Sequence, residues 1–199
     1  MYNKTNNSYL VQGRECGDCE VCCRTVSINT PELKKTANTN CHNLRPQGGC
    51  SLYPSWPPVC QKFYCAWRTL EDLDDSWRPD QNQIMIEFAR ENFPGPFAEQ
   101  TGFRFTVLDR NKLSKNRKFA RFIIEKIRNG IPCLLAFGIE KNTEPAAAFL
   151  NFALEKAVKS NKVNAVLREL TKALEACDNR PKLRFKIKNE ELVLAEEEI

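Results

Sequence analysis

A cysteine-rich stretch near the N-terminus reads CGDCEVCC over residues 16–23. It places Cys16, Cys19 and Cys22 at intervals of three, and Cys23 follows directly. Thiolates at this spacing in a loop or helical turn can converge on one ion or cluster, as in ferredoxin-type iron–sulfur loops. Neighbouring side chains diverge, so the doublet favours a polynuclear cluster, or two nearby ions bridged by a shared thiolate, over one isolated ion.

Four further cysteines follow, so that eight of the ten lie within the first 65 residues. Thiolates select zinc, copper(I) or iron–sulfur clusters over hard cations. Eight ligands could serve two four-coordinate sites, although their spacing does not match the paired C-x2-C…C-x2-C pattern of a single zinc ribbon. We therefore predict a metal centre, with iron or an iron–sulfur cluster favoured over zinc, whose ligands are Cys16, Cys19, Cys22, Cys23, Cys41, Cys50, Cys60 and Cys65.

The redox compartment decides between metal ligation and disulfides. The first residues, MYNKTNNSYLVQ, carry no apolar segment or cleavage-like site of a secretory signal peptide, so we expect a cytoplasmic location in which thiols stay reduced. A disulfide framework stays open as an alternative, because the eight cysteines are even in number. No stretch approaches the roughly 18 apolar residues of a membrane span.

The charge of the chain is mild and unevenly distributed. Formal net charge is +5 in 199 residues, which does not indicate a nucleic-acid or membrane partner; metal ions and a protein partner are the partners we expect. Residues 1–80 hold nine basic and nine acidic side chains, and the rest hold 21 and 16. The entire surplus therefore lies in the C-terminal part.

The composition divides the chain near residue 80. Residues 14–80 are rich in Cys, Pro, Gly and Asn, and their apolar content is too thin for a core without cross-links. We expect a flexible N-terminus over 1–13, a metal-stapled, loop-rich cysteine domain over 14–80 and an α+β region over 81–199. Within the cysteine domain, residues 26–28 predict a strand, Thr30 predicts a helix cap, and most of the segment after Asn43 predicts loop and turn.

The C-terminal region predicts three helices and a few short strands. Apolar runs and alternation predict strands over 84–88, 103–108 and 133–137, with a terminal hairpin pairing 183–188 with 192–195. Apolar stripes predict helices capped by Ser114 and Thr143 and a third over 163–177, and Gly130 suits the end of the first. Cys133 and Cys177 lie on apolar segments and are predicted to be buried free thiols.

The cysteine elements resemble a known family, the YkgJ-type CxxCxxCC domain, which is described as zinc- or iron-chelating. The resemblance covers residues 14–80 and includes the eight cysteines with their neighbours Leu44, Gly49, Ser51-Leu52-Tyr53, Pro57, Phe63 and Trp67. This chain differs from the usual pattern at Glu20 and Trp56. The resemblance implies a cysteine-bound metal or iron–sulfur centre, and one branch of the family methylates lysines of flagellin.

The function of such a centre has three interpretations. It can be a metal-binding protein without an assigned reaction, a protein methyl- or group-transferase that uses the centre, or an interaction module with a purely structural zinc site. The radical-SAM spacing CxxxCxxC, GxGxxG and HExxH are absent, so the sequence identifies no catalytic or cofactor-binding residue. His42, the only histidine, is expected to be an exposed loop residue rather than a ligand.

Overall fold

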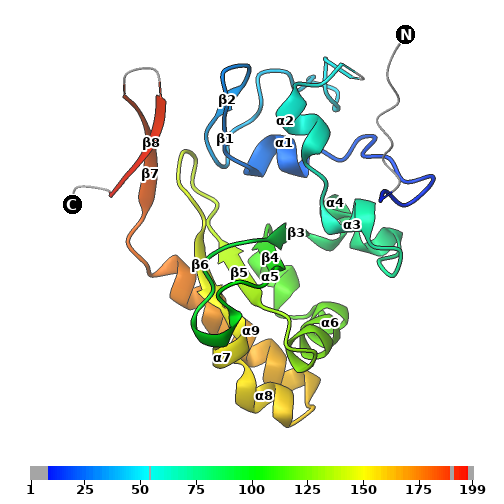
Figure 1. Cartoon of the computed structure of the whole chain (residues 1–199), viewed down its shortest axis with the longest axis vertical. Coiled ribbons are helices and arrows are strands. Elements are labelled where there is room, and N and C mark those ends of the chain that lie inside the picture. The colour runs from blue at the N-terminus through cyan, green and yellow to red at the C-terminus, as the bar shows by residue number, and fades with distance from the viewer. Residues whose placement is uncertain (1–8, 54, 189–190, 197–199) are drawn as a thin grey trace.

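The computed structural model describes residues 9–53, 55–188 and 191–196, and these form two lobes (Figure 1). We call residues 9–65 the cysteine lobe and residues 66–188 the sheet lobe, because the main hydrophobic core begins at Ala66 and runs to Cys177. Helices and strands alternate irregularly along the chain, so the predicted α+β class is confirmed. The domain division near residue 80 stays a prediction.

The cysteine lobe contains little regular structure. It holds helix α1 (Val21–Thr25), a two-stranded hairpin of β1 (Ile28–Asn29) and β2 (Lys34–Lys35), and helix α2 (Pro58–Lys62). The expected helix at Thr30 is wrong, because Thr30 closes the hairpin instead: its backbone N–H donates to the Leu33 carbonyl at 3.0 Å, and its hydroxyl accepts from the Leu33 N–H at 3.2 Å. The same side-chain bond that would cap a helix therefore closes a turn here.

Three short helical turns join the two lobes, where the sequence predicts only loop and turn. They are α3 (Ala66–Thr69), the 3-10 turn η1 (Asp75–Trp77) and α4 (Pro79–Asn82). Trp67, Leu73 and Trp77 from this stretch belong to the main core. Burial of these side chains explains why a sequence without helical periodicity nevertheless forms ordered turns.

A four-stranded sheet organises the sheet lobe, in the order β3 (Ile84–Ala89), β4 (Gly102–Val107), β5 (Cys133–Phe137), β6 (Ala146–Phe149). The β4 and β5 strands are parallel, and the other two pairs are antiparallel. Period-2 alternation directs Phe103, Phe105 and Val107 into the main core, which confirms the alternation predicted for this segment.

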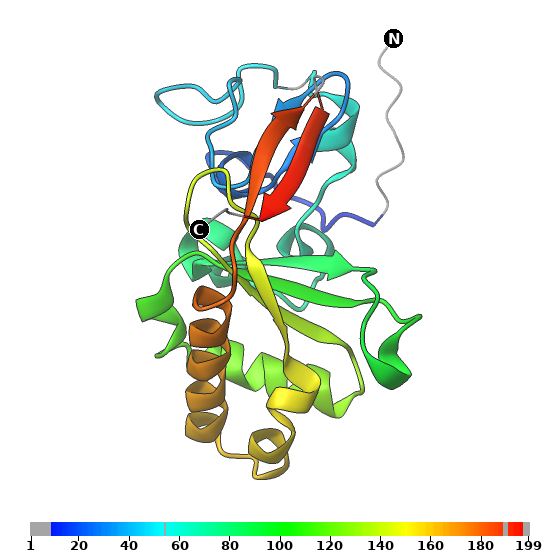
Figure 2. The same cartoon turned by 90° about the vertical axis from the view of Figure 1, so that its left-hand side faces the viewer.

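The helices of this lobe cover one face of the sheet, and the cysteine lobe lies on the other side of it (Figure 2). After the 3-10 turn η2 (Gly95–Phe97), they are α5 (Arg110–Leu113), α6 (Arg117–Arg128), α7 (Leu150–Ala153), α8 (Glu155–Lys159) and α9 (Val163–Asp178). The Phe105 and Phe119 rings meet edge to face at 5.1 Å between α6 and β4. The apolar stripe of α9 is buried as predicted.

Two predicted helix starts are wrong. Asn116 rather than Ser114 caps α6, by accepting the Phe119 N–H at 2.9 Å, and the residues before it form the separate turn α5. Thr143 caps no helix, because residues 146–149 pair with β5 as strand β6 and the helix starts only at Leu150. Pairing with an already buried strand outweighs the helical propensity of the three alanines in β6. Gly130 follows α6 with φ +70°, as expected for its helix-ending role.

The terminal hairpin pairs β7 (Leu183–Lys188) with β8 (Glu191–Glu196), as predicted, although its turn lies outside the described residues. It extends from the sheet lobe along the cysteine lobe (Figure 2), where the Asn29 side chain donates to the Leu192 carbonyl at 3.3 Å. Among the described residues, no helix has both the length and the apolar character needed to cross a bilayer.

Candidate metal centre

All eight predicted ligands lie in the cysteine lobe, on separate segments. Cys16 and Cys19 precede α1, Cys22 and Cys23 lie on it, Cys60 lies on α2 and Cys65 directly precedes α3. Cys41 and Cys50 lie in the long loop between β2 and α2. Each of the ten cysteines of the chain is among the described residues, and each is a free thiol.

Backbone hydrogen bonds join these segments. The Cys19 N–H donates to the Cys16 carbonyl at 2.8 Å, which forms the turn before α1. The Cys41 N–H donates to the Cys23 carbonyl at 2.9 Å, and a β-bridge pairs Leu44 with Cys50. Cys41 and Cys50 are therefore held beside the Cys23 end of α1.

Glu20 is a structural brace that sequence reasoning did not identify. Its carboxylate accepts from the Gly49 N–H at 2.9 Å and from the Arg24 guanidinium at 2.8 and 2.5 Å. Gly49 has φ +77°, a conformation that favours glycine. Glu20 thereby connects α1 to the loop that carries Cys50.

Four of the thiols surround a small cavity of about 30 Å³. Its walls combine Cys16, Cys19, Cys22 and Cys65 with the rings of Phe63, Tyr64 and Trp67, and Pro79 and Met85 close it from the sheet lobe. These three aromatic side chains therefore pack against the four thiols. The Trp56 ring instead lies edge to face with the Tyr53 ring, 4.9 Å away between ring centroids.

The adjacent thiols of Cys22 and Cys23 on α1 share a hydrogen bond that gives them different pKa values. The Cys22 thiol donates to Cys23, which raises the pKa of Cys22 well above its usual range and lowers the pKa of Cys23 to about 7. The Lys35 ammonium further lowers the pKa of Cys23. A thiolate therefore forms more readily at Cys23 than at Cys22.

Burial has the opposite effect on other ligand positions. It raises the pKa values of the Cys16 and Cys19 thiols, and it raises those of Cys60 and Cys65 to about 11. For Cys60, the neighbouring Cys23, Cys41 and Cys50 add to this effect. Without metal, most of these thiols are therefore protonated at neutral pH, and metal binding must release their protons.

Lys35 is a second residue that the sequence did not signal. Its side chain is buried, with Nζ donating to the carbonyls of Val26 at 2.6 Å and Thr36 at 3.1 Å. Burial lowers its pKa to about 8, and the nearby Cys41 and Cys23 partly oppose that shift. Lys35 places a cation beside a group of thiols, where it favours their ionised form.

The donor set fits a thiophilic metal in its chemistry, since it consists of free thiols gathered in one small lobe. Within the described residues, no three His, Cys, Asp or Glu side chains are grouped so that they could hold an ion without rearrangement. His42 is exposed and shares a 3.1 Å hydrogen bond with Asn43, in agreement with its expected role as a loop residue. Cys133 and Cys177 are buried in the main core, as predicted.

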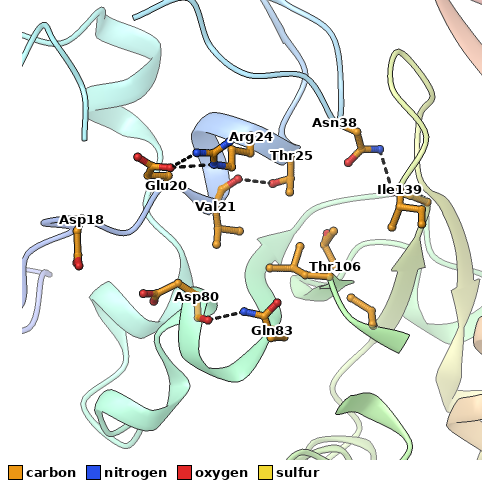
Figure 3. Close-up of a pocket in the computed structure, with 13 residues that line it drawn as sticks. Asp18, Glu20, Val21, Arg24, Thr25, Asn38, Asp80, Gln83, Thr106 and Ile139 are labelled. Carbon is orange, nitrogen blue, oxygen red and sulfur yellow. Dashed lines mark hydrogen bonds and ion pairs between the residues drawn. The ribbon is translucent and has the colours of Figure 1, made fainter. Parts of the chain in front are cut away.

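A larger cavity of about 420 Å³ separates α1 from the ends of β4 and β5 (Figure 3). Asp18, Asp80 and Thr106 contribute polar atoms to its walls. Arg78 pairs with Asp18 at 2.9 Å and with Asp80 at 2.6 Å, so the two carboxylates share one guanidinium. This cleft lies between α1, which carries Cys22 and Cys23, and the sheet lobe.

Comparisons with known proteins identify no relative: no protein-family model, no curated protein and no solved structure matches this chain.

Proposed function

We propose that this chain is a metal-binding protein whose eight N-terminal cysteines hold an iron–sulfur cluster or zinc or iron ions. The observation that carries the proposal is the gathering of eight free thiols, from separate segments, into one small lobe. The resemblance of these segments to the YkgJ-type CxxCxxCC domain supports the same conclusion. The ligands are Cys16, Cys19, Cys22, Cys23, Cys41, Cys50, Cys60 and Cys65.

The thin core of the cysteine lobe supports a role for the metal in stability. Among the described residues of this lobe, the buried apolar side chains are Val21, Leu33, Ala37 and Cys41. Loop-rich domains of this size depend on cross-links, and a structural metal can contribute about 10 kcal/mol or more of folding free energy. Bound metal would replace the missing hydrophobic core.

The doublet Cys22-Cys23 and the CxxCxxC spacing favour iron over zinc. Anaerobic purification, followed by an absorption spectrum and elemental analysis, tests this preference. A brown protein with iron and inorganic sulfide supports a cluster, and a colourless protein with zinc supports zinc. A protein that contains neither metal contradicts the proposed function.

The double variant Cys19→Ser/Cys22→Ser tests the ligands. We expect it to lose bound metal, because two of the four thiols around the small cavity are removed. Cys133→Ser is the matched control, since this buried thiol belongs to the main core and its loss should leave metal content unchanged. Full metal content in the double variant would contradict the assignment.

A protein methyl- or group-transferase is the second candidate, and the cleft beside α1 favours it. Its volume of about 420 Å³ falls within the roughly 300–1,000 Å³ typical of small-molecule sites. Calorimetric titration of anaerobically purified protein with S-adenosylmethionine tests this candidate. Failure to bind counts against a methyltransferase and leaves the metal-binding proposal intact.

A further inference from the structure

The thiols around the small cavity form the first of two groups. Cys16, Cys19, Cys22 and Cys65 line this cavity together, between the aromatic side chains of residues 63–67 and the residues that close it from the sheet lobe. Their charges act on one another as well: Cys65 responds to Cys16 and Cys19, and Cys22 responds to the same two thiols. Cys16 and Cys22 also respond to Cys23, which lies next to this group. We call these four cysteines the inner set.

The remaining four cysteines are not among the residues that line this cavity. The Cys41 N–H donates to the Cys23 carbonyl, and the bridge between Leu44 and Cys50 brings Cys50 back to the same loop. Cys60 on α2 completes the group, because its thiol interacts electrostatically with Cys23, Cys41 and Cys50. We call Cys23, Cys41, Cys50 and Cys60 the outer set.

The two sets meet on helix α1. Consecutive side chains on an α-helix point about 100° apart, since 3.6 residues make one turn. Cys22 lines the inner cavity and Cys23 does not, while the Cys23 carbonyl accepts the Cys41 N–H. The two thiols share a hydrogen bond, so the sets adjoin at this pair. In the sequence, the adjacency of Cys22 and Cys23 favours one polynuclear or bridged centre. The same adjacency is equally well explained if each residue is a ligand of a different metal site.

The geometry points to two separate four-thiolate metal sites: the inner set holds one, and the outer set holds the other. This inference rests on the proposed metal-binding function and adds the division of the ligands to it. Four thiolates are a complete ligand set for a tetrahedral zinc ion or for one iron–sulfur cluster. On binding a divalent ion, each protonated thiol of a set releases its proton to solvent and its sulfur donates an electron pair to the ion.

The side chains must turn inward to reach ligating positions, because no three of the described donor side chains are yet grouped to hold an ion. Their backbone positions are already set by the bonds around α1 and by the Glu20 brace. Cys22 must also give up its hydrogen bond to Cys23. Lys35, beside Cys23 and Cys41, supplies a positive charge to the outer set.

Cobalt(II) titration of the reduced, metal-free full chain under anaerobic conditions tests this division. Cobalt reports four-thiolate coordination through thiolate-to-metal charge-transfer absorption and tetrahedral d–d bands. The informative variants each remove two cysteines: Cys16→Ser/Cys65→Ser within the inner set, Cys41→Ser/Cys60→Ser within the outer set, and Cys16→Ser/Cys60→Ser across the two. The number of lost thiols is therefore matched.

We expect the wild-type chain to bind about two cobalt ions. Each within-set variant should bind about one ion and keep the four-thiolate spectrum, whereas the cross-set variant should bind no ion that shows this spectrum. Equal losses in all three variants, or one ion in the wild type, would overturn the division. A retained spectrum in the within-set variants also verifies that the lobe still folds. A wild-type chain that binds no cobalt would instead contradict the metal-binding function itself.

Discussion

Cys23 is a thiol whose pKa is lowered by its surroundings in the fold. Its usual pKa of 9.0 is lowered to about 7 by the hydrogen bond from Cys22 and by the nearby Lys35 ammonium. A lowered acid pKa means that the thiolate is already populated at neutral pH, whereas Cys60 and Cys65, at about 11, stay protonated. If the cysteines bind metal as proposed, Cys23 offers an incoming ion a thiolate that Cys60 and Cys65 do not.

Alkylation of the metal-free protein checks this difference in acidity. Iodoacetamide labelling of Cys23, followed by peptide mass spectrometry across pH, should reach half its maximal rate near pH 7. Cys22→Ala removes the hydrogen-bond donor, so the midpoint should move up toward the usual value of 9.0. Cys19→Ala is the matched control and should leave the midpoint unchanged. An unchanged midpoint in Cys22→Ala would show that the Cys22–Cys23 bond does not set this acidity.

Three polar residues other than the cysteines have structural roles in or beside the cysteine lobe. Glu20 braces α1 to the Gly49 loop, and Lys35 places a buried cation beside the thiols. Asn38, with φ 56°, donates to the carbonyls of Gly138 at 2.8 Å and Glu140 at 3.2 Å across the junction with the sheet lobe. Each of these roles depends on a partner distant in sequence, except for Lys35, whose acceptors are local.

At the scale of elements, a single buried amide joins β5 to α7. The Asn151 side chain accepts the Cys133 N–H at 2.8 Å and donates to the Ile131 carbonyl at 2.9 Å. Both bonds lie at the start of β5, the central strand whose five residues are all buried. The Asn151 amide therefore attaches α7, which directly follows β6, to the buried strand β5.

Asn151→Ala should destabilise the protein by about 1–3 kcal/mol, because it leaves a buried N–H and a partly buried carbonyl without their partners. Chemical denaturation followed by tryptophan fluorescence measures this loss. Asn92→Ala, at an exposed position, is the matched control and should change stability by less than about 0.5 kcal/mol. Equal stability of the two variants would show that the buried amide contributes nothing beyond a surface asparagine.

At the scale of the whole molecule, the two lobes are stabilised by different means. A continuous core of aromatic and aliphatic side chains fills the sheet lobe, whereas the cysteine lobe buries few apolar groups. If metal supplies the missing cross-links, its removal should affect the lobes unequally.

Chelation of the metal-loaded protein, followed by limited trypsin digestion, tests this asymmetry. We expect cleavage after Arg24 and Lys35, in the cysteine lobe, to accelerate by about tenfold or more once the lobe opens. Cleavage after Lys126 and Arg128, in α6 against the main core, provides the internal control and should stay slow. Equal acceleration at both places would show that the metal stabilises the whole chain, and no acceleration would show that the cysteine lobe does not need it.

The sequence predicted much of the sheet lobe, because its signals are local. Period-2 alternation predicted β4, a continuous apolar run predicted β5, and an apolar stripe predicted α9. The secondary-structure predictions were wrong where contacts with residues distant in sequence outweigh the local conformational preference of a segment. The segment 146–149 reads as helix but pairs with β5, and Thr30 closes a hairpin in place of capping a helix.

The sequence by itself determined the chemical identity of the proposed site: eight thiols, their CxxCxxCC spacing and the lack of an apolar core to hold them. Only the tertiary structure decided how those thiols are distributed. Spacing along the chain cannot predict that Cys22 lines a cavity with Cys65 while the Cys23 carbonyl bonds to Cys41, because both depend on how the loops and the sheet lobe pack around α1. The adjacent pair Cys22-Cys23 thus reads as one centre in the sequence and as the boundary between two sets in the fold.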